Sequence, residues 1–370
     1  MITKIRQNFH KKKNTDIVYF DFAKAFDRVD HNLIIEKLRE FGLDEYLCRW
    51  YENFLEGRKF FVKVGNCMSS ESASVPSGVI QGSVSGPILF IIFINTVFEL
   101  ADDDVTIQAF ADDLKIIGSD PLRVQSVIDK ICAWAKDNSM ELAPEKSSVM
   151  YFGRKNKRAN YVANNIIIPH KEHVRDLGVI IDNNLTFEKN TTSIVNIANL
   201  RSNQILRNFH FSTIKPYAFL FKMYVLPILE YCSEVYDPFL TKNLSNNLEN
   251  PLRQFTRKVF NRCNMPFESY EDRLKQINMV STHTRRSRAN IIHLFKALNG
   301  FSHQPETFDF ISFSTLPRHP ARLVLTQKCH KSFFSHTVPK WNSLSHLIEM
   351  NSSVQSFRIL INGLNASLLS

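Results

Sequence analysis

Residues 105–118 read Val-Thr-Ile-Gln-Ala-Phe-Ala-Asp-Asp-Leu-Lys-Ile-Ile-Gly. Two short apolar runs, 105–110 and 114–117, flank Ala111-Asp112-Asp113, and this pattern is typical of two strands joined by a tight turn. The stretch therefore predicts a β-hairpin with a pair of carboxylates at its turn. An Asp-Asp pair of this kind, taken alone, more often faces solvent than binds a ligand, so its meaning depends on the rest of the chain.

A second strand near the N-terminus delivers another carboxylate. Residues 17–22 are rich in β-branched and aromatic side chains, and Asp21 lies at the end of the run. Mg²⁺ prefers oxygen ligands, and two such ions about 3.5–4 Å apart can stabilise both the attacking and the leaving oxygen of a phosphoryl transfer. Asp21 beside Asp112 and Asp113 would supply such a site. Asp113 points away from Asp112 if the chain is extended there, which would make it the weaker ligand. Asp27 is expected to cap or pair near the following helix.

The remaining pattern predicts an α+β fold, strands and helices first and mostly helices afterwards. Apolar periodicity and helix-stop residues predict helices over 32–41, 44–55 and 122–137, a buried helix behind Pro87, and later helices near 194–206, 217–231, 248–262 and 284–299. Short strands are expected at 60–64, 149–152 and 177–181. Residues 1–15 are expected to be a lead-in without an element, and 301–340 to be irregular.

Composition limits the class of protein. Hydrophobic residues make up 44% of the 370 residues, which indicates a globular chain with a large core. Residues 251–370 hold 16 Lys and Arg against 6 Asp and Glu, which equals the whole net charge of +10. Such a basic segment is typical either of a phosphate-backbone partner or of a solvated surface. The six cysteines form no Cys-x-x-Cys pair, which favours reduced thiols in the nucleus or cytoplasm. No secretion signal or membrane-length apolar run is visible.

Four motifs in order carry a resemblance to a known family. They are Asp-Phe-Ala-Lys-Ala-Phe-Asp at 21–27, Ser-Gly-Val-Ile-Gln-Gly-Ser-Val-Ser-Gly-Pro at 77–87, Phe-Ala-Asp-Asp at 110–113, and 138–152 with Glu-Lys-Ser at 145–147. The chain from Asp16 to about Asn190 resembles the palm of a reverse transcriptase of the non-LTR (LINE-type) retrotransposons. Residues 224–238 and 333–344 resemble the downstream region of jockey-like elements.

The resemblance implies an architecture and an activity. The expected architecture is a polymerase palm, an antiparallel sheet with packed helices and residual fingers, over 1–175. A helical thumb over 176–245 and a basic, mainly helical region over 246–370 would follow. The expected activity is an RNA-directed DNA polymerase that adds dNTPs to a DNA primer on an RNA template, with two Mg²⁺ ions for which Mn²⁺ could substitute.

The resemblance also assigns roles to individual residues. The metal-binding carboxylates would be Asp21, Asp112 and Asp113, with Lys146 as the cation near the leaving pyrophosphate and its general acid. The substrate-binding residues would be Phe22, Phe26, Gly78, Gln81 and Gly82, and the Phe26 ring would exclude a 2′-hydroxyl. A nucleic-acid surface would comprise Arg285, Arg286, Arg288 and Lys296. Simpler alternatives remain open: a core Phe26, a solvated Lys146 and an ordinary exposed helix face.

The chain also departs from the family pattern. Ile80 replaces a usual proline, Ser85 a common leucine, and Thr96 a more usual aspartate. Only 20 residues precede Asp21, without a fingers region or an endonuclease domain, so we expect an N-terminally truncated part of a longer polyprotein. The main alternative is an inactive remnant that only binds nucleic acid. An intron-encoded maturase and a viral RNA polymerase match the motifs less well.

Overall fold

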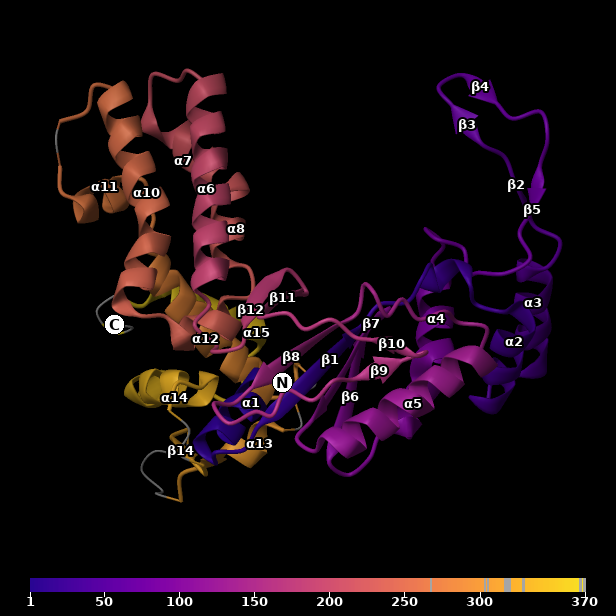
Figure 1. Cartoon of the computed structure of the whole chain (residues 1–370). Coiled ribbons are helices and arrows are strands. Elements are labelled where there is room, and N and C mark those ends of the chain that lie inside the picture. Colours follow the sequence, from indigo (N-terminus) through magenta and orange to yellow (C-terminus); the bar gives the residue numbers. More distant parts are fainter. Residues whose placement is uncertain are drawn as a thin grey trace. The chain divides into compact units, whose positions relative to one another are not determined.

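The computed structural model describes the whole chain except residues 267, 303, 305, 316–320, 328–329, 366–367 and 369–370. The chain divides into two compact units (Figure 1). One unit spans Lys12–Val174, and the other joins Met1–Lys11 to Arg175–Ser370. The mixed architecture confirms the predicted α+β class. Among the described residues, no helix combines the length and the apolar composition that a membrane span requires.

The unit Lys12–Val174 contains one larger sheet, several two-stranded ladders and four helices. Its elements are β1 Thr15–Phe20, α2 His31–Glu40, α3 Glu45–Leu55, β2 Lys59–Phe60, β3 Lys63–Val64, β4 Cys67–Met68, β5 Ala73–Ser74, α4 Gly86–Asn95, β6 Val105–Phe110, β7 Asp113–Gly118, α5 Pro121–Asp137, β8 Ser148–Phe152, β9 Val162–Ala163 and β10 Ile166–Ile167. The larger sheet is 4-stranded and antiparallel, in the order β6-β7-β1-β8. The strand β1 therefore lies inside the sheet, between β7 and β8.

Helices bury one face of this sheet. Val18 and Phe20 of β1 and Ile116 of β7 belong to the same hydrophobic core as the buried residues of α2, α3, α4 and α5. On α5 the buried residues are the predicted stripe, Val124, Val127, Ile128, Ile131, Trp134 and Ala135. Asp120 begins α5 by accepting a hydrogen bond from the Leu122 N–H, as a capping aspartate does. The prediction of this helix is confirmed.

The second unit is mainly helical. Its elements are α1 Ile2–His10, β11 His173–Asp176 at the boundary, β12 Val179–Asp182, α6 Glu188–Asn208, α7 Ile214–Tyr224, α8 Leu226–Glu230, α9 Ser233–Tyr236, α10 Lys242–Arg262, α11 Tyr270–Gln276, α12 Thr282–Leu298, α13 Thr307–Phe310, β13 Ile311–Phe313, β14 Leu323–Leu325, α14 Phe333–Leu344 and α15 Val354–Gly363. A core around α12, α14 and α15 stacks Phe295 on Phe357 with ring centroids 3.9 Å apart. The predicted division of this unit into thumb and C-terminal region, at 245, stays a prediction.

Three expectations about local structure were wrong. Residues 1–15 contain the helix α1, whose Ile5 is fully buried, so the segment is more than a lead-in. The region 301–340 contains β13, β14 and the start of α14, where Pro339 lies inside the helix and obscures its pattern. The predicted strand at 177–181 begins only at Val179, because Leu177 and Gly178 have positive φ and form a turn.

The helix α5 offers a test of this core. Replacing Ile131, which is fully buried, with alanine should destabilise the protein by about 2–5 kcal/mol, because a cavity remains among packed side chains. Leu122→Ala on the same helix, at a side chain that is 82% exposed, should change stability by about 0.5 kcal/mol or less. Urea unfolding followed by circular dichroism measures both. Equal losses for the two variants would contradict this packing of α5.

Candidate active site

The register of two strands brings the predicted carboxylates to one edge of the sheet. Phe20 of β1 pairs with Leu114 of β7, so the next position, Asp21, falls beside Asp113. The alternation of side chains along a strand places Asp21 and Asp113 on the same face. The β6–β7 hairpin closes with the pair Phe110–Asp113, which leaves Asp112 in the turn itself. The predicted hairpin with the acid pair at its turn is confirmed.

The donor set suits a hard cation. Asp21 and Asp113 are exposed and Asp112 is half-buried, so all three carboxylates are open to solvent. Carboxylate oxygens are the ligands that Mg²⁺ prefers. As the side chains are placed, no three His, Cys, Asp or Glu residues of the described chain are grouped closely enough to hold a metal ion. The observation that supports a metal site is therefore the strand register together with the chemistry of the donors.

A lysine that sequence reasoning missed lies on the same face. In the pairing of β7 with β1, Lys115 lies opposite Tyr19. Lys115 is two residues after Asp113 in the sequence, and Tyr19 is two residues before Asp21. Lys115 is only 7% exposed, and its ammonium lies 5.8 Å from the centre of the Tyr19 ring. The strand register therefore sets a buried cation on the same face of the sheet as Asp21 and Asp113. The sequence held one signal that could have identified this lysine: it is the single charged residue in the otherwise apolar run Leu-Lys-Ile-Ile at 114–117.

A turn from the fourth motif holds the backbone of Asp21. The Asp21 N–H donates to the Ser147 hydroxyl oxygen at 3.3 Å, and the Asp21 carbonyl accepts from the Ala143 N–H at 2.9 Å. Ser147 in turn donates to the Ala143 carbonyl at 2.9 Å. Lys146 is exposed and adjoins Ser147 in the chain, which places its backbone near the carboxylate edge. Its proposed role at the leaving group stays a prediction.

The second motif docks on the first through the backbone. The Gly78 N–H donates to the Val29 carbonyl at 2.7 Å, and the Val79 N–H donates to the Phe26 carbonyl at 2.8 Å. These bonds join the loop of residues 77–83 to the short helical turn that follows Asp21. Two sequence motifs about fifty residues apart thus form one structural element.

Side chains complete this docking. The Ser77 hydroxyl donates to the Asp27 carbonyl at 2.9 Å, and the Gln81 amide donates to the Asp27 carboxylate at 3.0 Å. The His31 ring hydrogen-bonds the Gly78 carbonyl at 2.9 Å. Asp27 therefore pairs with the loop, whereas the cap of the next helix is Asp30. Gln81 is exposed, so its hydrogen bond to Asp27 orients the amide and does not compensate for burial.

The two loop glycines have different structural reasons. Gly78 has φ +96°, and a Cβ there would lie 2.9 Å from the Asp27 Cα and from the Asp27 carbonyl oxygen. Its close approach is therefore to the chain's own backbone. Gly82 has φ +85°, but a Cβ there would meet open space. Only the backbone conformation requires glycine at that position.

The two predicted substrate-binding phenylalanines differ in exposure. The Phe26 ring is half-buried and stacks on Phe90 of α4 with centroids 4.2 Å apart, which fixes it beside the docked loop. The Phe22 ring is 3% exposed in the core and meets Trp134 edge-on at 6.4 Å. Burial excludes a contact of the Phe22 ring with substrate, and that part of the prediction is wrong.

Comparison with known proteins identifies the family. Residues 1–181 match the family model described as reverse transcriptase (RNA-dependent DNA polymerase). This chain belongs to the reverse transcriptase family. The matched residues include all four motifs that form the carboxylate edge and its supporting loops.

Its relatives include polymerases of non-LTR retrotransposons. An uncharacterised protein of Caenorhabditis elegans is 36% identical over 39% of this chain and 72% of the relative. The RNA-directed DNA polymerase from mobile element jockey of Drosophila funebris is 30% identical over 61% of this chain and 26% of the relative. The Pol polyprotein from type-1 retrotransposable element R2 of Popillia japonica is 25% identical over 68% of this chain and 43% of the relative. The chain thus spans less than half the length of these last two proteins.

The similarity to solved structures is weaker. Apo telomerase from Candida tropicalis aligns with 83% of this chain and 54% of its own, at 13% identity and a TM-score of 0.43. A similarity at this level carries no information on function.

The basic residues predicted to contact nucleic acid lie on α12, but most of them pair with groups of the chain itself. Arg286 is fully buried and donates from Nε to the Asp237 carboxylate at 2.7 Å, so its assignment to a nucleic-acid surface is wrong. Arg285 pairs with Glu230, and Arg288 donates to the Leu364 carbonyl at 2.8 Å. Lys296 is half-buried at the end of the helix.

Asp237 is the centre of a buried polar cluster that the sequence did not reveal. It accepts hydrogen bonds from Arg286, from the Asn290 amide at 2.9 Å and from the His336 ring at 3.2 Å. Burial opposes its ionisation, but the His336 hydrogen bond and the Arg286 charge outweigh burial and hold the pKa of Asp237 below its usual range. The cluster ties α12 and α14 to the turn that contains Asp237.

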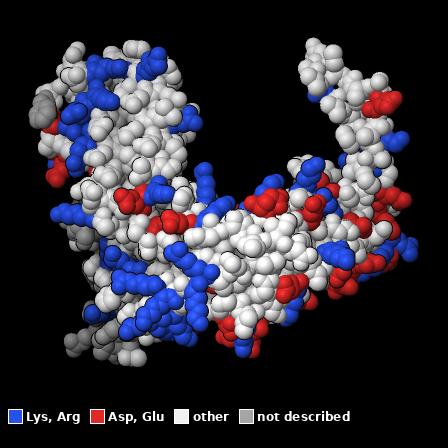
Figure 2. Space-filling model, viewed as in Figure 1, with Lys and Arg blue, Asp and Glu red and all other residues white. Residues whose placement is uncertain are grey.

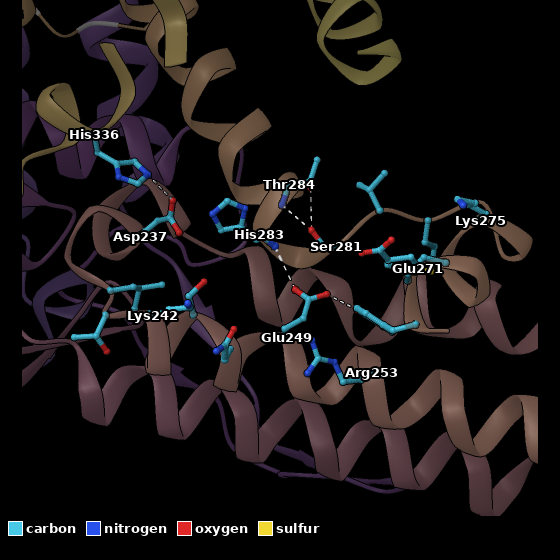
Figure 3. A pocket seen from close by; sticks show the side chains of 18 residues that line it. Asp237, Lys242, Glu249, Arg253, Glu271, Lys275, Ser281, His283, Thr284 and His336 are labelled. Carbon is cyan, nitrogen blue, oxygen red and sulfur yellow. Dashed lines mark hydrogen bonds and ion pairs between the residues drawn. The ribbon is translucent and has the colours of Figure 1, made fainter. Parts of the chain in front are cut away.

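A cavity of about 830 Å³ adjoins this cluster (Figure 3). Glu249 reaches from α10 toward the start of α12, where its carboxylate accepts from the Thr282 N–H at 2.9 Å and the His283 N–H at 3.3 Å. Tyr270 donates its hydroxyl proton to the same carboxylate. Burial, reinforced by the charges of Lys340 and Arg286, lowers the pKa of His283. The hydrogen bonds from Thr282, His283 and Tyr270 satisfy the buried Glu249 carboxylate, as expected of a structural element.

The loop glycines give a matched pair of variants. Gly78→Ala should destabilise the protein more than Gly82→Ala, because the added methyl group meets the Asp27 backbone in addition to the strained φ. Gly82→Ala should cost about 1 kcal/mol, the usual penalty for a side chain in the left-handed region. Chemical denaturation of both variants measures the difference. If Gly82→Ala is the more damaging of the two, the docking of the loop on Asp27 is incorrect.

The buried ion pair gives a test that depends on pH. Asp237→Asn should cost about 3–5 kcal/mol, because it leaves the buried Arg286 without a counter-charge. Asp102→Asn at the exposed pair with Arg123 should cost about 1 kcal/mol or less. The native pKa of Asp237 is depressed, so its stabilisation is complete above the unfolded pKa of about 4 and is lost as the pH falls further. Denaturation at neutral and acidic pH should show the gap between the Asp237 variant and wild type shrinking. A gap that is constant with pH would contradict an ionised Asp237.

Proposed function

We propose that this chain carries the polymerising site of an RNA-directed DNA polymerase of a non-LTR retrotransposon. The site would add deoxynucleotides to the 3′ end of a DNA primer on an RNA template. The observation that carries the proposal is the β1–β7 register, which sets Asp21 beside Asp113 and the Asp112 turn. The relatives named RNA-directed DNA polymerases support the same activity.

Asp21, Asp112 and Asp113 would hold two Mg²⁺ ions, with Mn²⁺ as a substitute. When bound, such ions stabilise the attacking and the leaving oxygen of the transfer. Lys115 would keep the net charge of the edge from becoming strongly negative before the metals bind. Lys146 would approach the departing pyrophosphate and supply a proton to it.

The docked loop would shape the pocket for the incoming nucleotide. The stack of Phe26 on Phe90 holds the Phe26 ring in place, so it would leave no room for a 2′-hydroxyl group. Gln81, held by the Asp27 carboxylate, would lie against the new base pair. Discrimination between deoxynucleotides and ribonucleotides would thus come from a rigid wall.

Primer extension on poly(rA)/oligo(dT) with Mg²⁺, and then Mn²⁺, tests this function. Asp112→Asn and Asp21→Asn should each reduce dTTP incorporation by about 100-fold or more, because removing one fixed charge at the reacting group costs several kcal/mol. Asp103→Asn is the matched control, since Asp103 is an exposed aspartate of the loop before β6. It should leave incorporation unchanged.

Two other outcomes would overturn the proposal. Extension by wild type that Asp112→Asn retains would mean that the activity comes from another site or a contaminant. Binding of the primer–template without extension in either metal would mean that the chain is a nucleic-acid-binding remnant.

A further inference from the structure

An exposed β-arm lies between the first and second motifs. The β-arm comprises residues 58–75, in which β2 pairs with β5 and β3 pairs with β4 around a turn at Gly65. Figure 1 shows it standing clear of the helices α2 to α4 of its own unit. Nearly every residue of the β-arm is exposed. A two-stranded ribbon of this kind is only marginally stable without something packed against it.

The β-arm presents a contiguous set of large apolar side chains to solvent. Their exposed fractions lie between 50% and 75%, and they are Phe60, Phe61, Val62, Val64 and Met68. Soluble proteins rarely leave such a cluster open unless it meets a partner. Other large apolar side chains of the unit are exposed as well, among them Trp50, Ile91 and Leu122. What distinguishes the β-arm is that five of them fall within residues 60–68, on a ribbon that buries almost nothing.

Charge and spacing indicate the kind of partner. The β-arm holds three basic residues, Arg58, Lys59 and Lys63, against one acidic residue, Glu71. Lys59 and Phe60 form β2 and Lys63 begins β3, so the two lysines flank Phe60 and Phe61 along the ribbon. Cations interleaved with exposed aromatic rings are the combination that binds single-stranded nucleic acid, through phosphate contacts and base stacking. A purely apolar protein partner would leave these lysines desolvated and unpaired.

The base of the β-arm is fixed to the candidate active site. The Val75 N–H donates to the Arg58 carbonyl at 2.9 Å, which closes the ribbon. The Arg58 guanidinium lies 5.3 Å from the centre of the Phe54 ring on α3. Three residues after Val75 comes Gly78, whose loop docks on Asp27. A strand bound along the β-arm would therefore be guided by an element anchored at the same loop.

We propose that the β-arm binds unpaired nucleic acid, with Phe60 and Phe61 stacking on bases and Lys59 and Lys63 contacting phosphates. Its identification as the unpaired RNA template rests on the proposed polymerase function. The binding itself requires neither metal nor nucleotide, so it is measured separately from catalysis.

Fluorescence anisotropy of a labelled oligouridylate with the full chain tests the proposal. Phe60→Ala and Phe61→Ala should each weaken binding about 5-fold or more, as expected for the loss of one stacked base. Lys59→Gln and Lys63→Gln should each reduce the slope of log K against log salt by about 0.7. Phe308→Ala, at a ring that is 52% exposed in the other unit, is the matched control and should bind like wild type.

A duplex of poly(rA) and poly(rU) of the same length separates stacking from general damage. Stacking requires unpaired bases, so the phenylalanine variants should bind the duplex as wild type does. Equal losses on both probes, or affinities within about 2-fold of the Phe308→Ala control, would overturn the proposal. Unchanged RNA binding with a shift from dimer to monomer in sedimentation would show that the β-arm instead meets a second copy of this chain. Failure of primer extension alone would leave the proposal intact.

Discussion

The antiparallel pairing of β1 with β7 is the interaction on which the candidate site depends. Side chains alternate with a period of two along a strand, so a slip of one residue would move Asp21 to the face that packs against the helices. The apolar side chains prevent that slip, because Val18 and Phe20 must stay in the core shared with α2 to α5. The carboxylate edge is thus positioned by hydrophobic burial elsewhere on the same strands, together with the backbone hydrogen bonds that join Asp21 to Ser147 and Ala143.

The second constraint is the contact of the 77–83 loop with the turn after Asp21. That contact combines backbone and side-chain hydrogen bonds to Phe26, Asp27 and Val29 with the burial of Val79 in the core. It requires a residue without Cβ at Gly78, since the Asp27 backbone occupies that space. A resemblance between motifs identifies both segments but gives no reason for the glycine. The reason lies in a long-range approach that only the folded chain contains.

Local patterns were predictable where the decisive interactions lie near one another in the sequence. The α5 stripe and the β6–β7 hairpin each follow from periodicity and turn chemistry within about fifteen residues. The helix α1 was not predictable in this way, because Ile5 gains its burial from residues beyond 175. The prediction for Arg286 failed for the same reason. The run Arg-Arg-Ser-Arg suggests an exposed basic face, but the ion-pair partner of Arg286, Asp237, lies 49 residues away in the sequence.

The burial of Arg286 changes how the basic character of the C-terminal region is understood. Figure 2 shows Lys and Arg side chains predominating over the visible face of that unit, but the formal excess counts buried cations as well. Arg286 is neutralised by Asp237, Arg285 by Glu230, and Arg273 is only 6% exposed. Only cations that can release counter-ions from phosphates contribute to the salt dependence of binding. Lys59 and Lys63, which form no ion pair within the described residues, belong to that class despite lying in the nearly neutral part of the chain. The charge available to bind phosphates therefore depends on how many cations are left without an internal ion pair. By this measure the short β-arm can contribute more to nucleic-acid binding than the longer basic segment 251–370.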